Sequence, residues 1–322
     1  MKSRTFLLTL GCMAFGFGAL AQSDVTEKEI AEHISFLASP KMAGRFPGTK
    51  ENRKVVRYLI KNFKQAGITP FGNSYIQNFQ AKIRVKKGVT DTPFVETQNV
   101  IGFIEGTDPV LKHEFVVLGA HYDHLGMGGP SSKKPDTVGI HLGADDNASG
   151  TAALLEIGEM LAANRKALKR SVLLIAFGAE EQGLLGSKYF VEHPLIPLPA
   201  IKLMLNMDMV GRMNAEKQLY MGGAASFDGG MELMKKLGPE AGINPIVIAY
   251  DVGGSDHVSF YKKNIPVLGF HTGGHPQYHT PEDDFAHINV PGEKLVCDYI
   301  YKAIVAVAGR EGAVSFVPEK KD

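Results

Sequence analysis

Hydrophobic residues near the start of the chain recur at helical spacing. A capping box, Thr26-x-x-Glu29, opens a stretch in which Ile30 and Ile34 fall on one face. A second helix is predicted over residues 49–66, whose apolar positions also fall on one face. Both helices are therefore expected to pack one side against a core.

The pattern changes at residue 75, and residues 75–103 alternate in the way that is typical of strands. From residue 115 onward, short continuous apolar runs alternate with helical stretches. The runs are expected to be strands buried on both faces, at residues 115–120, 172–177, 203–207, 246–249 and 266–270. Helices are expected at residues 151–163, 230–237 and 291–307. This alternation predicts an α/β fold of three layers, α/β/α, around a central mixed, mostly parallel sheet.

A signal peptide is predicted over residues 1–21, followed by a single domain over residues 22–322. A basic start precedes an apolar stretch at residues 6–20, which is short for a membrane span and leads into an A-x-A cleavage motif ending at Ala21. The protein is therefore expected to be exported, to the periplasm or outside the cell, without stable membrane insertion. Two alternatives stay open: a retained membrane anchor, and lipoprotein processing at Gly11-Cys12.

The charge balance excludes binding to polyanions. The chain carries 35 basic and 34 acidic residues, and the leader holds two of the basic ones, so the mature chain has 33 minus 34, a net charge of −1. No basic excess remains to bind nucleic acid or an anionic membrane. Of the two cysteines only Cys297 remains after cleavage, so no intramolecular disulfide can form. An exported fold of this kind depends on a large core or on a metal.

Acidic and histidine side chains follow three predicted strands at the point where each strand ends. His121 and Asp123 follow the first, Glu180-Glu181 follows the second, and Asp208 follows the third. The carboxyl ends of strands in an open α/β sheet form the crevice where ligands bind, so these side chains are expected to converge. Asp145-Asp146, in a loop rich in glycine and alanine, adds two further carboxylates.

This set of side chains favours a metal. Imidazole and carboxylate ligands together suit zinc, and no cysteine cluster competes with them. Carboxylates that converge without a cation would repel one another and take up protons. One ion would not neutralise them all, whereas two would, and hydrolytic sites often hold two metals about 3.5–4 Å apart.

Five segments, in this order, resemble the secreted bacterial zinc aminopeptidases, which share a superfamily with glutamate carboxypeptidase II, glutaminyl cyclase and the transferrin receptor. The segments are GAHYDHLG at 119–126, GADDNASG at 143–150, AEEQGLLGS at 179–187, NMDM at 206–209 and YHTPED at 278–283. AGRFPGT at 43–49 also resembles the N-terminal region of the family. The resemblance covers residues 36–309 and implies the zinc-dependent exopeptidase fold.

The resemblance implies two zinc ions and five metal ligands, which are His121, Asp146, Glu181, Asp208 and His279. His121 and Asp208 would hold one ion, Glu181 and His279 the other, and Asp146 would bridge the two. The bridging aspartate of this motif directly precedes the asparagine, and a cis peptide bond is expected between the two residues.

The resemblance further implies hydrolysis of the N-terminal peptide bond of a peptide with a free N-terminus. Glu180 is expected to be the general base, taking a proton from a water that bridges the metals and returning it to the leaving amine. Tyr278 is expected either to polarise the scissile carbonyl or to pack within its loop. Asp123 is expected to accept the second ring N–H of His121 and so orient the imidazole. Asp145 is not expected to be a ligand.

Other polar residues near these segments receive lesser roles. His124 and His141 flank the ligand motifs and are expected to be structural or solvent-facing. His275 lies four residues before His279, but glycine and proline between them make this spacing meaningless. Asp256 and His257 resemble a family segment near the substrate pocket and are expected to shape that pocket.

Three alternatives accompany the aminopeptidase interpretation. A glutaminyl cyclase would use one zinc and pocket tryptophans, and the chain has no tryptophan. A carboxypeptidase or dipeptidase would bind a substrate carboxylate with an arginine, for which Arg212 is the first candidate and Arg45 the second. A non-catalytic binding domain would be expected to have lost metal ligands, and none is missing.

Overall fold

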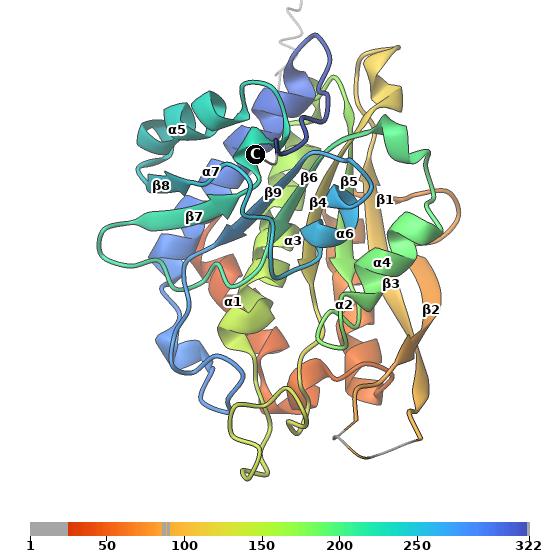
Figure 1. The fold of residues 1–322 in the computed structure, drawn as a ribbon, viewed down its shortest axis with the longest axis vertical. Coiled ribbons are helices and arrows are strands. Elements are labelled where there is room, and N and C mark those ends of the chain that lie inside the picture. Colours follow the sequence, from red (N-terminus) through yellow and green to blue (C-terminus); the bar gives the residue numbers. More distant parts are fainter. Residues whose placement is uncertain (1–24, 86–87, 89–90, 321–322) are drawn as a thin grey trace, which may run out of the picture.

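A nine-stranded sheet forms the centre of the computed structural model, which describes residues 25–85, 88 and 91–320 (Figure 1). The predicted signal peptide and Cys12 lie outside the described residues. In spatial order the strands are β1 (Thr69–Pro70), β3 (Phe94–Ile104), β5 (Ser171–Phe177), β4 (Phe115–His121), β6 (Ile201–Met207), β9 (Val267–His271), β7 (Gln218–Gly222) and β8 (Asn244–Val247), with β2 (Ile76–Lys82) also paired to β3.

The four central strands β5, β4, β6 and β9 are parallel, and antiparallel pairs occur toward both edges. β3 runs against β5 on one side, and β7 runs against β9 on the other. The predicted mixed, mostly parallel sheet is therefore confirmed, and its parallel centre brings the carboxyl ends of four strands to one edge.

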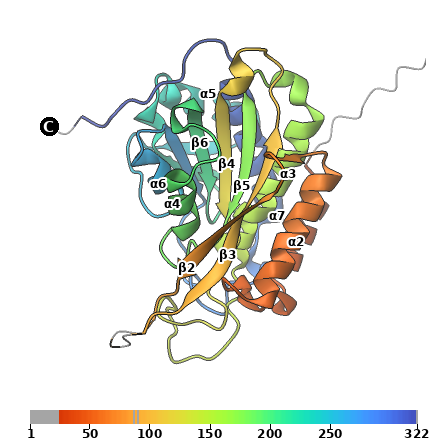
Figure 2. The ribbon, with the colours of Figure 1, turned by 90° about the vertical axis from the view of Figure 1, so that its right-hand side faces the viewer.

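Helices cover both faces of the sheet (Figure 2). One face carries α1 (Glu27–Leu37), α2 (Lys50–Gln65), α3 (Gly150–Ala163), α5 (Gly230–Ala241) and α7 (Val290–Gly309), and the other carries α4 (Leu185–Glu192) and α6 (His257–Tyr261). Among the described residues, no helix combines the length and the apolar character needed to cross a bilayer.

Successive residues of the central strands enter two different cores, which explains why their sequences are continuously apolar. In β5, Leu174 and Ala176 pack in the core beneath α3 and α7, whereas Leu173 and Ile175 pack in the core beneath α4 and α6. Side chains alternate along a strand, so a strand covered on both faces needs apolar residues at every position.

Most of the predicted elements are present with small shifts at their ends. Thr26 and Thr49 cap α1 and α2, each accepting a backbone N–H three residues later (3.2 and 3.1 Å). The prediction that residues 246–249 form a strand buried on both faces is wrong. β8 spans Asn244–Val247, lies at the edge of the sheet and is partly exposed, because nothing pairs with its outer side among the described residues.

Candidate metal centre

The parallel strands deliver five side chains to one edge of the sheet. His121 is the last residue of β4, Glu180 and Glu181 follow β5 after two residues, and Asp208 follows β6 directly. His279 lies in the loop between β9 and α7. The shared direction of these strands, rather than closeness in sequence, brings the five side chains together.

Asp146 comes from the loop before α3, whose backbone is held on several sides. The Asp146–Asn147 peptide bond is cis, as expected. The side-chain amide of Asn147 donates to the carbonyl of Met207 (2.9 Å) and accepts the N–H of Gly150 (2.9 Å). This arrangement ties the loop to the end of β6.

The two carboxylate oxygens of Asp146 face different groups of side chains. Oδ1 lies 3.3 Å from Nε2 of His121, and this nitrogen lies 3.4 Å from Oδ1 of Asp208. Oδ2 lies 3.1 Å from Nε2 of His279, and that nitrogen lies 3.3 Å from Oε2 of Glu181. One carboxylate thus stands between two donor sets, an arrangement that suits a bridge between two cations.

Both histidines hold their second ring nitrogen against a backbone carbonyl. Nδ1 of His279 is 2.8 Å from the carbonyl oxygen of Ser131, and Nδ1 of His121 is 3.2 Å from the carbonyl oxygen of Asp123. A proton on Nδ1 satisfies each of these contacts and leaves Nε2 free to bind a metal.

The contact expected between His121 and the Asp123 carboxylate is not the one observed. Asp123 Oδ1 lies 3.9 Å from Nδ1 of His121, beyond hydrogen-bond distance, and the backbone carbonyl of Asp123 takes that position instead. The carboxylate accepts the backbone N–H groups of Glu180 (3.0 Å) and Glu181 (3.4 Å). Asp123 therefore holds the segment that carries the two glutamates.

His124 joins the site although the sequence analysis assigned it a structural or solvent role. It is fully buried, and Nδ1 lies 2.7 Å from Oε1 of Glu181, without hydrogen-bond geometry at either atom. A buried nitrogen and a buried oxygen that lie this close together without a hydrogen bond are suited to binding the same cation. His141, by contrast, contacts Ser132 (2.8 Å) and the carbonyl of Gly139 (3.1 Å) within its own loop.

Electrostatics in the cluster are unbalanced without a cation. Burial and the nearby carboxylates raise the pKa of Glu180 well above its ordinary value. For Glu181, burial and the charge of Asp146 act in the same direction, but the nearby imidazole nitrogens of His124 and His279 outweigh them and lower the pKa to about 2. Burial would lower the pKa of His279, yet its contacts with Asp146 and Glu181 raise it to about 10. Buried acids crowded in this way are stabilised by nearby positive charge, which a metal ion would supply.

Asp145 points away from this cluster into a neighbouring network. Its carboxylate accepts the N–H of Gly211 (2.7 Å) and lies 3.2 Å from Nε2 of His275. Asp283, which the sequence analysis did not single out, accepts the backbone N–H groups of both Asp145 and Asp146 and pairs with Arg212. Its position inside the YHTPED segment was the only available indication.

The two arginines considered as carboxylate binders are committed elsewhere. Arg212 donates to Asp283 (3.0 Å) and Gln277 (2.8 Å). Arg45 is fully buried and donates to four backbone carbonyls, at Leu37, Tyr122, Leu142 and Gly143. Both guanidinium groups are thus occupied within the protein, which disfavours the alternative in which Arg212 or Arg45 binds a substrate carboxylate.

A hollow of about 300 Å³ opens beside the cluster. Glu180 and Tyr278 line it, and Tyr278 stacks on the ring of His279 (ring centres 3.8 Å apart). Burial raises the pKa of Tyr278, so its hydroxyl keeps a proton to donate.

His257 lines the hollow as expected, but Asp256 is fully buried and does not. The charge of Asp256 contributes to the raised pKa of Glu180.

Comparison with known proteins gives a consistent result. The model of peptidase family M28 matches residues 99–304. Aminopeptidase YwaD of Bacillus subtilis is 29% identical over 74% of this chain and 50% of its own length, so the chain spans about half of that relative.

Two solved structures share the fold. The zinc aminopeptidase BSAP of Bacillus subtilis superposes with a TM-score of 0.71 at 19% identity, covering 90% of this chain and 97% of its own. The glutaminyl cyclase of Porphyromonas gingivalis superposes with a TM-score of 0.69 at 21% identity, covering 88% and 98%. The fold alone therefore does not separate a hydrolase from a cyclase.

Proposed function

Because the chain belongs to peptidase family M28, we propose that it is a zinc-dependent aminopeptidase that releases the N-terminal residue of peptides. The observation that carries the proposal is Asp146, whose two oxygens face two separate donor sets at 3.1–3.4 Å. The relatives named aminopeptidases support the same activity.

Two zinc ions fit the residues present. His121, Asp208 and one oxygen of Asp146 would hold the first, and Glu181, His279 and the other oxygen would hold the second. Three carboxylates and two neutral imidazoles suit zinc and balance most of its charge. His279 is preferred over His124 as ligand because Ser131 orients its ring, whereas Nε2 of His124 has no hydrogen-bond partner among the described residues.

The chain's own groups then supply the proton transfers. Bound zinc provides Lewis acidity, which polarises a carbonyl and makes water more acidic. Glu180 lines the hollow beside the cluster, and its carboxylate takes the proton of the attacking water and returns it to the departing amine. The hydroxyl of Tyr278 donates a hydrogen bond to the carbonyl oxygen that gains charge and keeps its proton. The backbone N–H of Glu180 donates a hydrogen bond to Oδ1 of Asp123 (3.0 Å), and this contact keeps the base in position.

Export and a single domain over residues 22–322 belong to the same proposal. The basic, apolar and A-x-A pattern of residues 1–21 supports removal of a signal peptide. All five proposed metal ligands are present, which favours a hydrolase over a non-catalytic binding domain that needs no metal.

Zinc content and peptide cleavage test the proposal together. The purified chain should contain two zinc ions and release the chromophore from a leucyl chromogenic amide. Cyclisation of an N-terminal glutaminyl peptide without release of an amino acid would favour a glutaminyl cyclase instead. Stoichiometric zinc with no release from any aminoacyl amide would contradict the aminopeptidase proposal.

A further inference from the structure

A second hollow, of about 380 Å³, adjoins the first at the candidate metal centre. Glu180, Tyr278 and His279 line both hollows. The first is lined by further acids, Asp208 and Asp251, and by no lysine or arginine. The second is lined by Arg84. The reacting groups therefore stand between an acidic hollow and one with a cation.

Arg84 is held at the second hollow by its backbone. It follows β2, and its N–H donates to Oε1 of Gln182 (2.9 Å). The guanidinium lies against Gly183, since a Cβ on that glycine would be 3.2 Å from Nη2. The side chain is exposed and has no ion pair among the described residues. Its charge is thus free to meet a ligand.

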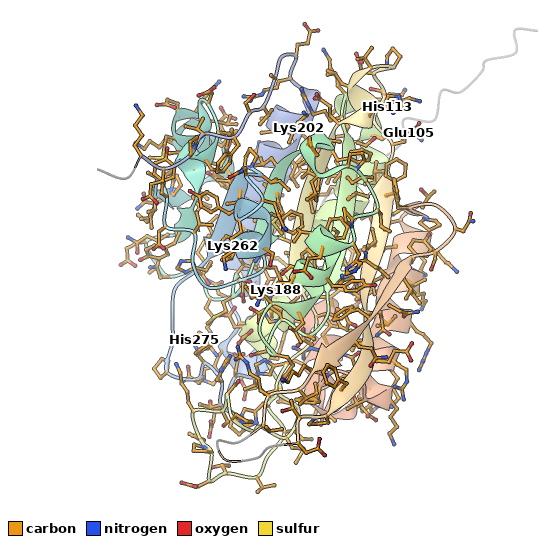
Figure 3. All side chains as sticks on the ribbon, turned by 45° about the vertical axis from the view of Figure 1, so that its right-hand side comes forward. Glu105, His113, Lys188, Lys202, Lys262 and His275 are labelled. Atoms are coloured by element: carbon orange, nitrogen blue, oxygen red, sulfur yellow. The ribbon has the colours of Figure 1, made fainter. Side chains whose placement is uncertain are left out.

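Two lysines extend the positive charge around this hollow. Lys188, on α4 (Figure 3), donates to the carbonyl of Gly183 (2.8 Å). Nζ of Lys133 lies 4.2 Å from the ring centre of Tyr278. Neither lysine pairs with an acid in the described part of the chain. The only carboxylates that line the second hollow are Glu180 and Glu181, which the proposed function assigns to proton transfer and metal binding.

We propose that Arg84 binds a carboxylate on the residue that the enzyme releases as the leaving group. The inference rests on the proposed aminopeptidase function. A substrate whose ammonium group lies toward the acidic hollow carries its second residue toward Arg84, and the second hollow, of about 380 Å³, is large enough to hold that residue. The free C-terminal carboxylate of a dipeptide meets this guanidinium, so dipeptides are the preferred substrate class. Arginine recognises carboxylates through two parallel N–H donors.

Four peptides distinguish a C-terminal carboxylate from a side-chain carboxylate on the second residue. The zinc-loaded full chain is given Leu-Gly, Leu-Gly-amide, Leu-Asp-amide and Leu-Asn-amide. We expect a KM about tenfold lower for Leu-Gly than for Leu-Gly-amide, the size of one partly exposed charge-assisted contact. A preference for Leu-Asp-amide over Leu-Asn-amide instead would assign the carboxylate to the side chain of the second residue and would still support Arg84.

Variants test the residue itself. Arg84→Gln should remove the difference between Leu-Gly and Leu-Gly-amide, and Arg84→Lys should keep part of it. Arg57→Gln removes the same charge from the exposed side of α2, lines neither hollow and should leave the difference unchanged. Equal KM values for all four peptides, or an equal loss on all four in Arg84→Gln, would overturn the inference.

A binding measurement separates this inference from the proposed function. Leu-Gly and its amide are titrated calorimetrically into Glu180→Gln protein, with and without Arg84→Gln. Tighter binding of Leu-Gly that depends on Arg84 supports the inference even if no peptide is cleaved. Normal cleavage of a leucyl chromogenic amide, with no preference for a peptide that has a free carboxylate, would contradict the role of Arg84 and leave the aminopeptidase proposal intact.

Discussion

The backbone N–H of Asp146 donates a hydrogen bond to Oδ2 of Asp283 (3.0 Å). The same carboxylate accepts the N–H of Asp145 (3.1 Å) and pairs with Arg212 (3.0 Å). A buried acid four residues beyond His279 thus holds the loop that presents the proposed bridging ligand. The two loops are positioned by each other as well as by the strands.

Asp283→Asn should weaken zinc binding by about 10–100-fold, the usual cost of losing a partner that orients a ligand. The amide retains the shape but offers only one acceptor oxygen to three donors. Competition with a zinc chelator of known affinity measures the effect. Asp284→Asn, at a partly exposed neighbour that caps the short turn after it, serves as control and should bind zinc normally. Unchanged affinity in Asp283→Asn would contradict the positioning role.

Glu180→Gln should keep its zinc but lose about 10²–10⁴-fold in kcat, because the proton acceptor is gone while the ligands remain. Steady-state kinetics on a leucyl amide and elemental analysis of the same sample give both values. Loss of zinc in this variant would mean that Glu180 and Glu181 have exchanged roles.

Asp146→Ala should lose zinc from both positions, whereas Asp145→Asn should retain two ions. The carboxylate of Asp146 stands between the two donor sets, and that of Asp145 faces His275 and Gly211. Zinc content after dialysis distinguishes the variants. Two tightly bound ions in Asp146→Ala would show that another group bridges the metals.

Removing zinc from the native chain should lower its thermal stability. The carboxylates then repel one another, and a ligand present at 100 times its dissociation constant contributes about 2.7 kcal/mol to the free energy of unfolding. Calorimetry before and after treatment with a chelator, followed by zinc replacement, measures the change. A melting temperature that does not move would argue against a metal bound at this site.

Glu293→Gln should make the free energy of unfolding less dependent on pH. Glu293 is fully buried in the first turn of α7, and its carboxyl has no hydrogen-bond partner within the described part of the chain. Burial and then repulsion from Asp145 raise its pKa well above 4.5. The folded protein keeps this proton where the unfolded chain loses it, so stability falls as pH rises above 4.5.

Glutamine cannot ionise, so the variant should gain about 1.4 kcal/mol per pH unit relative to the native chain above that pH, until the folded pKa is reached. Urea unfolding between pH 5 and pH 8 measures the difference. Glu232→Gln, an exposed change on α5, is the control and should follow the native curve. Parallel curves for Glu293→Gln and the native chain would contradict the prediction.

The sheet could be predicted from the sequence because its central strands are buried on both faces and so are apolar at every position. β7, α4 and α6 were missed, since they are short and their apolar positions follow no clear period. β8 was misjudged because an edge strand with a few apolar residues resembles a buried one locally.

The candidate site was predictable where a side chain follows a strand directly, as for His121 and Asp208. It was not predictable where contacts depend on how loops fold over one another. His124, Asp283 and Arg84 belong to this second group. Nothing in their local sequence shows that they face Glu181, the backbone of Asp146 and the second hollow, respectively.

The order of the side chains along the chain has a consequence for biogenesis. His121 and His279 are separated by 279 minus 121, or 158, positions, and Asp146, Glu181 and Asp208 come from three segments between them. Contacts this distant in sequence close late in folding. Until residue 279 has been made, a growing chain lacks one of the five proposed ligands, so the complete site can bind zinc only after nearly all of the chain has been synthesised. If the chain is exported as proposed, the zinc supply outside the cytoplasm, rather than that at the site of synthesis, then determines how much of the protein carries metal.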